Sequence, residues 1–324
     1  MKKYMLALGL SLLTVLGLFT GCSPKAETAS DPDSLKIVAT IFPEYDWVRQ
    51  VLGDRAGEVE LTLLLDSGTD LHSYQPTAAD MLTIGECDLF LYNGGESEAW
   101  VERVLATAAN PDHRTLSVME VLGDSVLEEE VVEGMQEAED HDHAEGEAHE
   151  EEADEHVWLS LRNARTACAE IARVLGELDP DHAAEYQTNA ENYMAELEAL
   201  DGEYTALAEN AARRTVLVGD RFPFRYLMDD YGLEYYAAFS GCSAETEASF
   251  ETIAFLSGKT EELALPCILT TESPQPGVAE TIRSNTASGD QTILQLDSMQ
   301  SAGTGDNYLD IMKENLEVLR QALA

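Results

Sequence analysis

Residues 181–211 read DHAAEYQTNAENYMAELEALDGEYTALAENA and form the most periodic segment of the chain. Apolar or small side chains recur along it at alternating spacings of three and four residues, at Ala183, Tyr186, Ala190, Tyr193, Leu197, Leu200, Tyr204 and Leu207. This spacing places all eight on one face of a helix that would be roughly 45 Å long at 1.5 Å per residue. We expect a rigid helix that joins two lobes, and a coiled-coil dimer is the competing interpretation.

Strand-like apolar segments alternate with helical segments on both sides of this helix. Before it they occupy 36–41, 59–65 and 88–92, and after it 215–218, 233–239, 268–271 and 292–296. This alternation is typical of mostly parallel sheets covered by helices. The sequence therefore predicts an α/β fold with two lobes, at 35–180 and 212–324, joined by one long backbone helix at 181–211.

The first residues of the sequence predict export. Lys2 and Lys3 precede an apolar run that ends at Phe19 and is followed by Thr-Gly-Cys22. The run is short for a membrane span and is typical of a signal peptide, here 1–21. Its end resembles a bacterial lipobox, so we expect a lipid on Cys22 and a polar linker at 22–34 that tethers the protein outside the cell membrane.

The net charge limits the possible partners, and the cysteine positions predict which thiols are buried. The chain has 62 Asp and Glu residues against 19 Lys and Arg, a formal net charge of −43, which repels nucleic-acid phosphates and excludes DNA and RNA as partners. Such a surface attracts cations but also simply keeps a protein soluble. Cys87, Cys168 and Cys267 lie in apolar surroundings and are expected in the core, whereas Cys242 is expected in a loop with a free thiol.

The segment 128–155 reads EEEVVEGMQEAEDHDHAEGEAHEEEADE. Its like charges and scarcity of aliphatic residues predict a long mobile acidic loop. His141, His143 and His149 lie within it and could collect divalent cations loosely, or could be incidental to a solvated loop.

Two further histidines lie where ligands usually bind. His72, in GTDLHSYQP (68–76), follows a predicted strand, at the carboxyl end where open α/β sheets bind their ligands. His156 lies where the acidic loop meets Val-Trp-Leu and a helix begins. Either could be structural, but together they indicate one cleft.

Several segments in this order carry a family resemblance: GTDLHSYQPTAAD (68–80), DLFLYNG (88–94), HVWL (156–159), YGL (231–233), GCSAETEAS (241–249), Thr271-Glu272 and 308–323. With the acidic loop and the long helix, they make the chain resemble the extracytoplasmic solute-binding proteins of zinc and manganese ABC transporters, many of them lipoproteins. The resemblance implies a non-enzymatic, monomeric protein that captures one divalent cation between two α/β lobes and delivers it to a membrane permease. Zinc is the expected ligand, with manganese as the alternative.

The resemblance also implies the ligands of the cation. His72, His156 and Asp297 match the positions of family ligands, and Glu272 matches a carboxylate that some members use. Imidazoles and carboxylates suit both zinc and manganese. The remaining family position aligns with Arg221, and a guanidinium stays protonated and cannot ligate a cation.

Three explanations of Arg221 stay open. Water or Glu272 could complete a site with three protein ligands, Asp220 could take the position, or the cleft could bind an anion or a chelated metal. Arg221 could also be structural, paired with Glu272 or Asp297. The competing functions are therefore a binding protein for an anionic solute or metal chelate, an extracellular metallohydrolase, and a metal-dependent surface adhesin.

Overall fold

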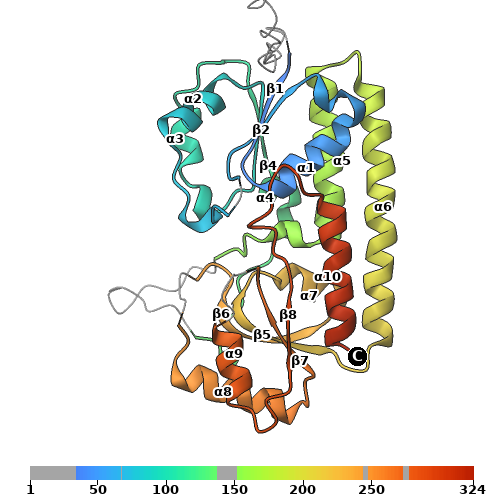
Figure 1. Ribbon diagram of the computed structural model, residues 1–324. Helices are drawn as coiled ribbons and strands as arrows, with labels where there is room; N and C mark the ends of the chain where they lie inside the picture. The colour runs from blue at the N-terminus through green and yellow to red at the C-terminus, as the bar shows by residue number, and fades with distance from the viewer. Residues whose placement is uncertain (1–33, 67, 137–151, 244–246, 273–276) are drawn as a thin grey trace, which may run out of the picture. The chain divides into compact units, whose positions relative to one another are not determined.

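Two four-stranded parallel sheets organise the chain (Figure 1). The computed structural model describes residues 34–66, 68–136, 152–243, 247–272 and 277–324, and Leu35–Ala324 form one unit. The predicted signal peptide and most of the predicted linker lie outside the described residues. The predicted α/β fold with two mostly parallel sheets is confirmed.

The first sheet has the strand order β2-β1-β3-β4, with all neighbours parallel. Its strands are β1 (Lys36–Ala39), β2 (Glu60–Leu63), β3 (Leu89–Tyr92) and β4 (Arg114–Ser117). The two central strands read KIVA and LFLY and are almost wholly buried, as expected for parallel strands covered on both faces. β4 was not predicted, because its sequence RTLS has exposed polar residues at its start and becomes a strand only by pairing with β3.

The second sheet has the order β6-β5-β7-β8, again all parallel. Its strands are β5 (Thr215–Phe222), β6 (Glu234–Ser240), β7 (Cys267–Thr270) and β8 (Thr292–Gln295). All four were predicted, but β5 runs beyond its predicted end at Val218, after a register shift between Val218 and Arg221. In each sheet the strand order reverses beside the first strand of the lobe, and such positions bind ligands at the carboxyl ends of the strands.

Helices cover the sheets (Figure 1). They are α1 (Phe42–Leu52), α2 (Ala78–Glu86), α3 (Val101–Leu105), α4 (Val118–Leu122), α5 (Leu161–Leu178), α6 (Ala183–Asn210), α7 (Arg225–Tyr231), α8 (Phe250–Glu262), α9 (Gly277–Ser284) and α10 (Tyr308–Ala322). Within the described ranges, none of these helices has both the length and the apolar character needed to cross a membrane.

The long helix α6 has 28 residues and follows the predicted periodicity. Its buried face runs from Tyr186 to Tyr204 at the predicted positions and ends at Ala208, one residue after the predicted Leu207. This face packs against α1 and α5 near the first sheet and against α7 and α10 near the second. Since the chain's own helices contact the apolar face, the periodicity is explained without a coiled-coil partner.

Hydrogen bonds around Trp158 and Tyr308 join the two lobes. The Trp158 Nε1–H donates to the Ser298 carbonyl at 2.9 Å, and the Tyr308 hydroxyl donates to the Trp158 carbonyl at 2.7 Å. The backbone N–H of Tyr308 donates to Asp46 Oδ2 at 2.9 Å. The segment around Trp158 is therefore fixed to residues of the second lobe.

The cysteine predictions are confirmed. Cys87, Cys168 and Cys267 are buried, Cys242 is partly exposed, and all four are free thiols.

We predict that Leu197→Ala lowers the free energy of unfolding by about 2–5 kcal/mol, because it opens a cavity where the leucine is fully buried between helices. Glu196→Ala, on the exposed face of the same helix, is the control and should change it by less than about 0.5 kcal/mol. Urea unfolding followed by circular dichroism measures both. Equal effects would show that the face of α6 carrying Leu197 contributes no more to stability than the exposed face.

Candidate metal centre

His72 lies in a short 3₁₀ helix, Leu71–Ser73, that follows β2. Asp70 caps this turn: its Oδ1 accepts a hydrogen bond from the backbone N–H of His72 at 3.0 Å. Its other oxygen, Oδ2, accepts from the Arg221 guanidinium at 2.8 Å. Arg221 of the second lobe therefore helps to hold the turn that carries His72.

His156 is fully buried just before the 3₁₀ helix Val157–Leu159 and the start of α5. Asp154 Oδ1 accepts hydrogen bonds from both the backbone N–H of His156, at 2.9 Å, and its Nδ1, at 3.0 Å. Gly241 lies against the ring, where a Cβ atom would come within 2.7 Å of His156 Cε1. The ring is thus fixed by a carboxylate on one edge and by close backbone packing.

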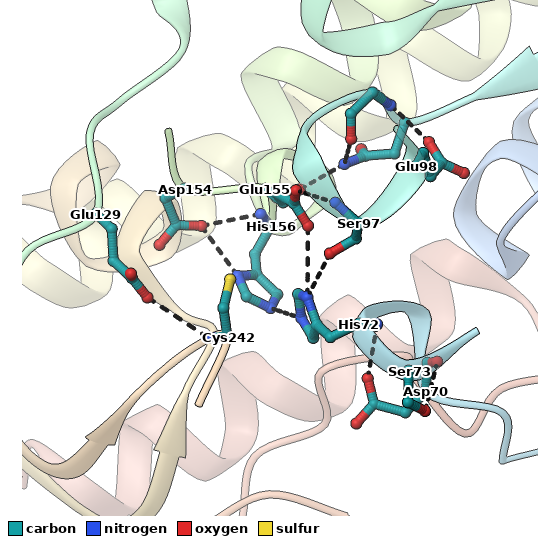
Figure 2. Close-up of polar contacts among 12 residues, drawn as sticks. Asp70, His72, Ser73, Ser97, Glu98, Glu129, Asp154, Glu155, His156 and Cys242 are labelled. Atoms are coloured by element: carbon teal, nitrogen blue, oxygen red, sulfur yellow. Dashed lines mark hydrogen bonds and ion pairs between the residues drawn. The ribbon is translucent and has the colours of Figure 1, made fainter. Parts of the chain in front are cut away.

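The two imidazoles meet through their Nε2 atoms, which are 3.1 Å apart (Figure 2). On the opposite edge of the His72 ring, Nδ1 lies 2.9 Å from Ser97 Oγ and 3.4 Å from Glu155 Oε2. The structure therefore brings together the two histidines that the sequence predicted to share one cleft.

The groups at the Nδ1 atoms bear on where the imidazole hydrogens lie. Burial alone would raise the pKa of Glu155, but hydrogen bonds from His72 and Ser97 outweigh it and lower that pKa. A carboxylate accepts hydrogen bonds, so Nδ1 of His156 carries the hydrogen that faces Asp154, whereas Nδ1 of His72 faces the Ser97 hydroxyl, which can donate or accept. Nε2 of His156 is then left with a lone pair that faces Nε2 of His72.

Two ring nitrogens at this distance share either a hydrogen or a cation, because two bare lone pairs would repel each other. The Gln300 amide Nε2, a donor only, lies 3.4 Å from His156 Nε2, which agrees with a lone pair there. At Zn–N distances of about 2.0–2.1 Å, nitrogens 3.1 Å apart subtend an angle of about 100° at the metal, close to tetrahedral. Carboxylates that hold the second nitrogen of a ligating imidazole are also usual in metal sites. The pair can hold one proton or one metal ion.

Cys242 joins the two histidines. Its Sγ and one ring nitrogen of each histidine all lie within 4.8 Å of one another, and in the part of the chain that is described no other group of three or more His, Cys, Asp or Glu residues is as close. Burial, followed by the charges of Glu129, Glu155 and Asp154, raises the pKa of the Cys242 thiol, which keeps its proton in the absence of a cation. The sequence analysis predicted a free thiol here but no place in the site.

Glu272 and Asp297 follow β7 and β8, also at the carboxyl ends of strands, but they do not belong to this cluster. Both Glu272 oxygens accept hydrogen bonds from the turn after β8: from Ser298 N and Oγ, at 2.9 and 2.7 Å, and from Gln300 N, at 3.0 Å. Asp297 Oδ1 accepts from Met299 N at 2.7 Å. Their predicted role as ligands stays a prediction.

A cavity of about 220 Å³ lies beside the cluster. Asp70, Arg221, Gly241, Glu272 and Gln300 are among its lining residues. Since Gly241 and Gln300 also contact His156, the cavity borders the imidazole pair.

The structure gives Arg221 a different partner from those considered in the sequence analysis. Its guanidinium pairs with Asp70 and not with Glu272 or Asp297. Burial alone would raise the pKa of Asp70, but the hydrogen bond and charge of Arg221 outweigh it and lower that pKa. Arg221 therefore forms an ion pair with the ionised carboxylate of Asp70.

Asp220, the other candidate for the missing ligand, lies outside the cluster of His72, His156 and Cys242. Its Oδ2 accepts hydrogen bonds from the hydroxyls of Thr270 and Thr271, both at 2.8 Å, and from the backbone N–H of Thr271. The carboxylate thus connects the end of β5 to the end of β7.

The predicted extent of the mobile acidic loop is wrong at its ends. Glu128 and Ala153 form an antiparallel bridge, and Asp154 and Glu155 are buried beside the imidazoles. Pairing with other parts of the chain orders these residues despite their charge. His141, His143 and His149 lie outside the described residues, so their predicted collection of cations stays a prediction.

Comparisons with known proteins also indicate a metal-binding protein. The family model described as "Zinc-uptake complex component A periplasmic" matches residues 37–322. The chain is 32% identical to the zinc-binding lipoprotein AdcA of Streptococcus pneumoniae over 99% of its own length, but it spans only 61% of that relative. It is 30% identical to the high-affinity zinc uptake system protein ZnuA of Bacillus subtilis, with 93% of this chain and 91% of that protein covered.

The fold is also similar to that of a solved zinc complex. The Zn(II)-bound ZnuA-like domain of Streptococcus pneumoniae AdcA superposes with a TM-score of 0.69 at 28% identity, covering 90% of this chain and 99% of that domain.

We predict that Asp297→Asn stabilises the metal-free protein at neutral pH. Burial, and then the charge of Glu272, raise the pKa of Asp297 from 3.8 to about 6, so the folded state binds more protons than the unfolded state between these values. Stability therefore falls as pH rises from about 4 to 6, at about 1.4 kcal/mol per pKa unit, and the variant avoids this cost. Melting temperatures in the presence of a chelator should be higher for the variant at pH 7.5 and converge with wild type near pH 4. A gain that is independent of pH would contradict this origin.

Proposed function

Because the chain belongs to the family of the periplasmic component A of zinc-uptake complexes, we propose that it captures a zinc ion outside the cytoplasmic membrane and delivers it to an ABC permease. One observation carries the proposal: Nε2 of the fully buried His156 and Nε2 of the partly buried His72 lie 3.1 Å apart, with Asp154 at Nδ1 of His156 and Ser97 and Glu155 at Nδ1 of His72. Imidazole nitrogens in this arrangement are suited to a borderline-soft divalent cation.

Zinc fits this donor set better than manganese. Manganese favours oxygen ligands, whereas the closest atoms here are imidazole nitrogens and a sulfur. The carboxylates Asp297 and Glu272 would contribute to capture from the second lobe, where they follow adjacent strands.

Membership of the family supports anchoring at the membrane and delivery to a permease. We infer that Cys22 carries the lipid that holds the protein at the outer face of the cell membrane, close to the permease. The name of the relative AdcA describes a zinc-binding lipoprotein, and that of ZnuA describes part of a zinc uptake system.

A carrier explains the site better than a metallohydrolase. Hydrolysis would need an open metal position and a free general base beside it. Of the carboxylates nearest the imidazoles, Asp154 accepts two hydrogen bonds from His156, and Glu155 accepts one from the backbone N–H of Ser97 and lies 3.4 Å from the His72 ring, so both are engaged by residues of the site. An anionic ligand or a chelate is also disfavoured, because the charge of Arg221 is already neutralised by Asp70.

We predict that His72→Ala and His156→Ala each weaken zinc binding by roughly tenfold or more, because each removes a nitrogen that would bond the ion directly. His113→Ala is the matched control, since the His113 ring contacts the Asn110 carbonyl in its own turn and lies outside the cluster. Competition titration of the purified mature protein with a zinc chelator of known affinity measures all three variants.

Two results would contradict the proposal. Titration curves for both histidine variants that overlay the wild type would remove these residues from the site. A wild type that takes up zinc only when citrate is present would favour a chelate-binding protein.

We predict that Asp297→Ala weakens zinc binding to a similar extent and that Glu272→Ala weakens it less. Glu272 already accepts three hydrogen bonds from the turn after β8, whereas Asp297 accepts one from Met299 and carries a charge that burial penalises. The same titration compares them. A larger loss in Glu272→Ala would reverse the assignment of the carboxylate ligand.

A further inference from the structure

We propose that the Cys242 sulfur is a third protein ligand of the cation held by His72 and His156, and that this sulfur makes the site discriminate zinc from manganese. The inference deepens the proposed function and rests on it. It concerns which atoms bind the ion and which metals are excluded.

The geometry is that of a metal site contributed by three parts of the chain. His72 follows β2, His156 precedes α5 and Cys242 follows β6, yet one atom of each lies within 4.8 Å of the others (Figure 2). In a tetrahedral zinc site with Zn–S of about 2.3 Å and Zn–N of about 2.0–2.1 Å, sulfur and nitrogen lie roughly 3.5 Å apart. A small movement of the Cys242 side chain is therefore enough to complete three bonds.

Backbone packing fixes Cys242 in this place. A Cβ on the preceding residue, Gly241, would come within 2.7 Å of His156 Cε1 and 2.9 Å of the Phe222 carbonyl oxygen, so only glycine lets the chain approach the ring this closely. On the other side the backbone N–H of Cys242 points to Glu129 Oε1, at 3.5 Å. The thiol is consequently held at the imidazole pair by contacts that do not involve the sulfur itself.

The surrounding charges favour a divalent cation at this point. Asp154 lies at Nδ1 of His156, Glu155 lies near Nδ1 of His72, and Glu129 lies beside Cys242 (Figure 2). When zinc binds, the S–H bond of Cys242 breaks, a Zn–S bond forms and the proton leaves to solvent, so no oxidant or reductant is required. The thiolate and the nearby carboxylates then offset the charge of the ion.

Sulfur changes which metal the site prefers. Thiolates select zinc and other soft or borderline ions, whereas manganese gains little from a sulfur ligand. The sulfur therefore supplies discrimination that two imidazoles and carboxylates alone do not.

The test compares wild type with Cys242→Ser, which replaces only the sulfur by oxygen. We expect zinc affinity to fall by roughly tenfold or more and manganese affinity to change by less than about twofold, so that the ratio of the two affinities falls. In the cobalt(II) form, wild type should show the near-ultraviolet charge-transfer band of a sulfur–cobalt bond and Cys242→Ser should lack it. Cys267→Ala, which removes a buried thiol at the start of β7, is the control and should retain both the band and the affinity.

The outcomes separate this inference from the proposed function. If wild type binds zinc tightly but shows no sulfur–cobalt band, or if Cys242→Ser retains the zinc affinity of wild type, Cys242 is not a ligand while zinc capture stands. If wild type binds neither zinc nor cobalt, both are wrong. Because the cobalt spectrum of wild type is informative alone, the test survives a variant that does not fold.

Discussion

The candidate site depends on the packing of one face of α6 against helices of both lobes. His72 and His156 come from the first lobe and Cys242 from the second, so their distances are set by how the lobes pack and not by local sequence. α6 contacts helices of both lobes along a single face, and the Trp158 Nε1–H bond to Ser298 fixes the segment after His156 to the second lobe. A site divided between two sheets can be preorganised only if such a connection is rigid.

Much of this fold could be predicted, because periodicity reports burial directly. The buried face of α6 followed the predicted positions until Leu207, where Ala208 is buried in its place. Seven of the eight strands were apolar enough to stand out. β4 was missed because Arg114 and Thr115 are exposed and the strand exists through its pairing with β3, which no local pattern records.

The site was predictable where loops follow strands and less so where distant segments meet. His72 and His156 were expected to share a cleft, and their Nε2 atoms are 3.1 Å apart. Cys242 was missed because a cysteine between glycine and serine carries no sign of its neighbours, although its position after β6 is where such sheets place functional residues. The partner of Arg221 was missed for the same reason, since Asp70 lies 151 residues away in sequence.

The same contacts that prepare the site for a cation destabilise the protein when no cation is bound. The Nε2 atoms of the two imidazoles lie only 3.1 Å apart, and burial beside Glu272 raises the pKa of Asp297 to about 6. In the metal-free protein, burial raises the pKa of the Cys242 thiol, which keeps its proton. Under the proposed binding of zinc at Cys242 this proton must leave, so binding would release it and weaken as pH falls. Acidification would therefore favour release of a cation from the same groups that are proposed to capture it at neutral pH.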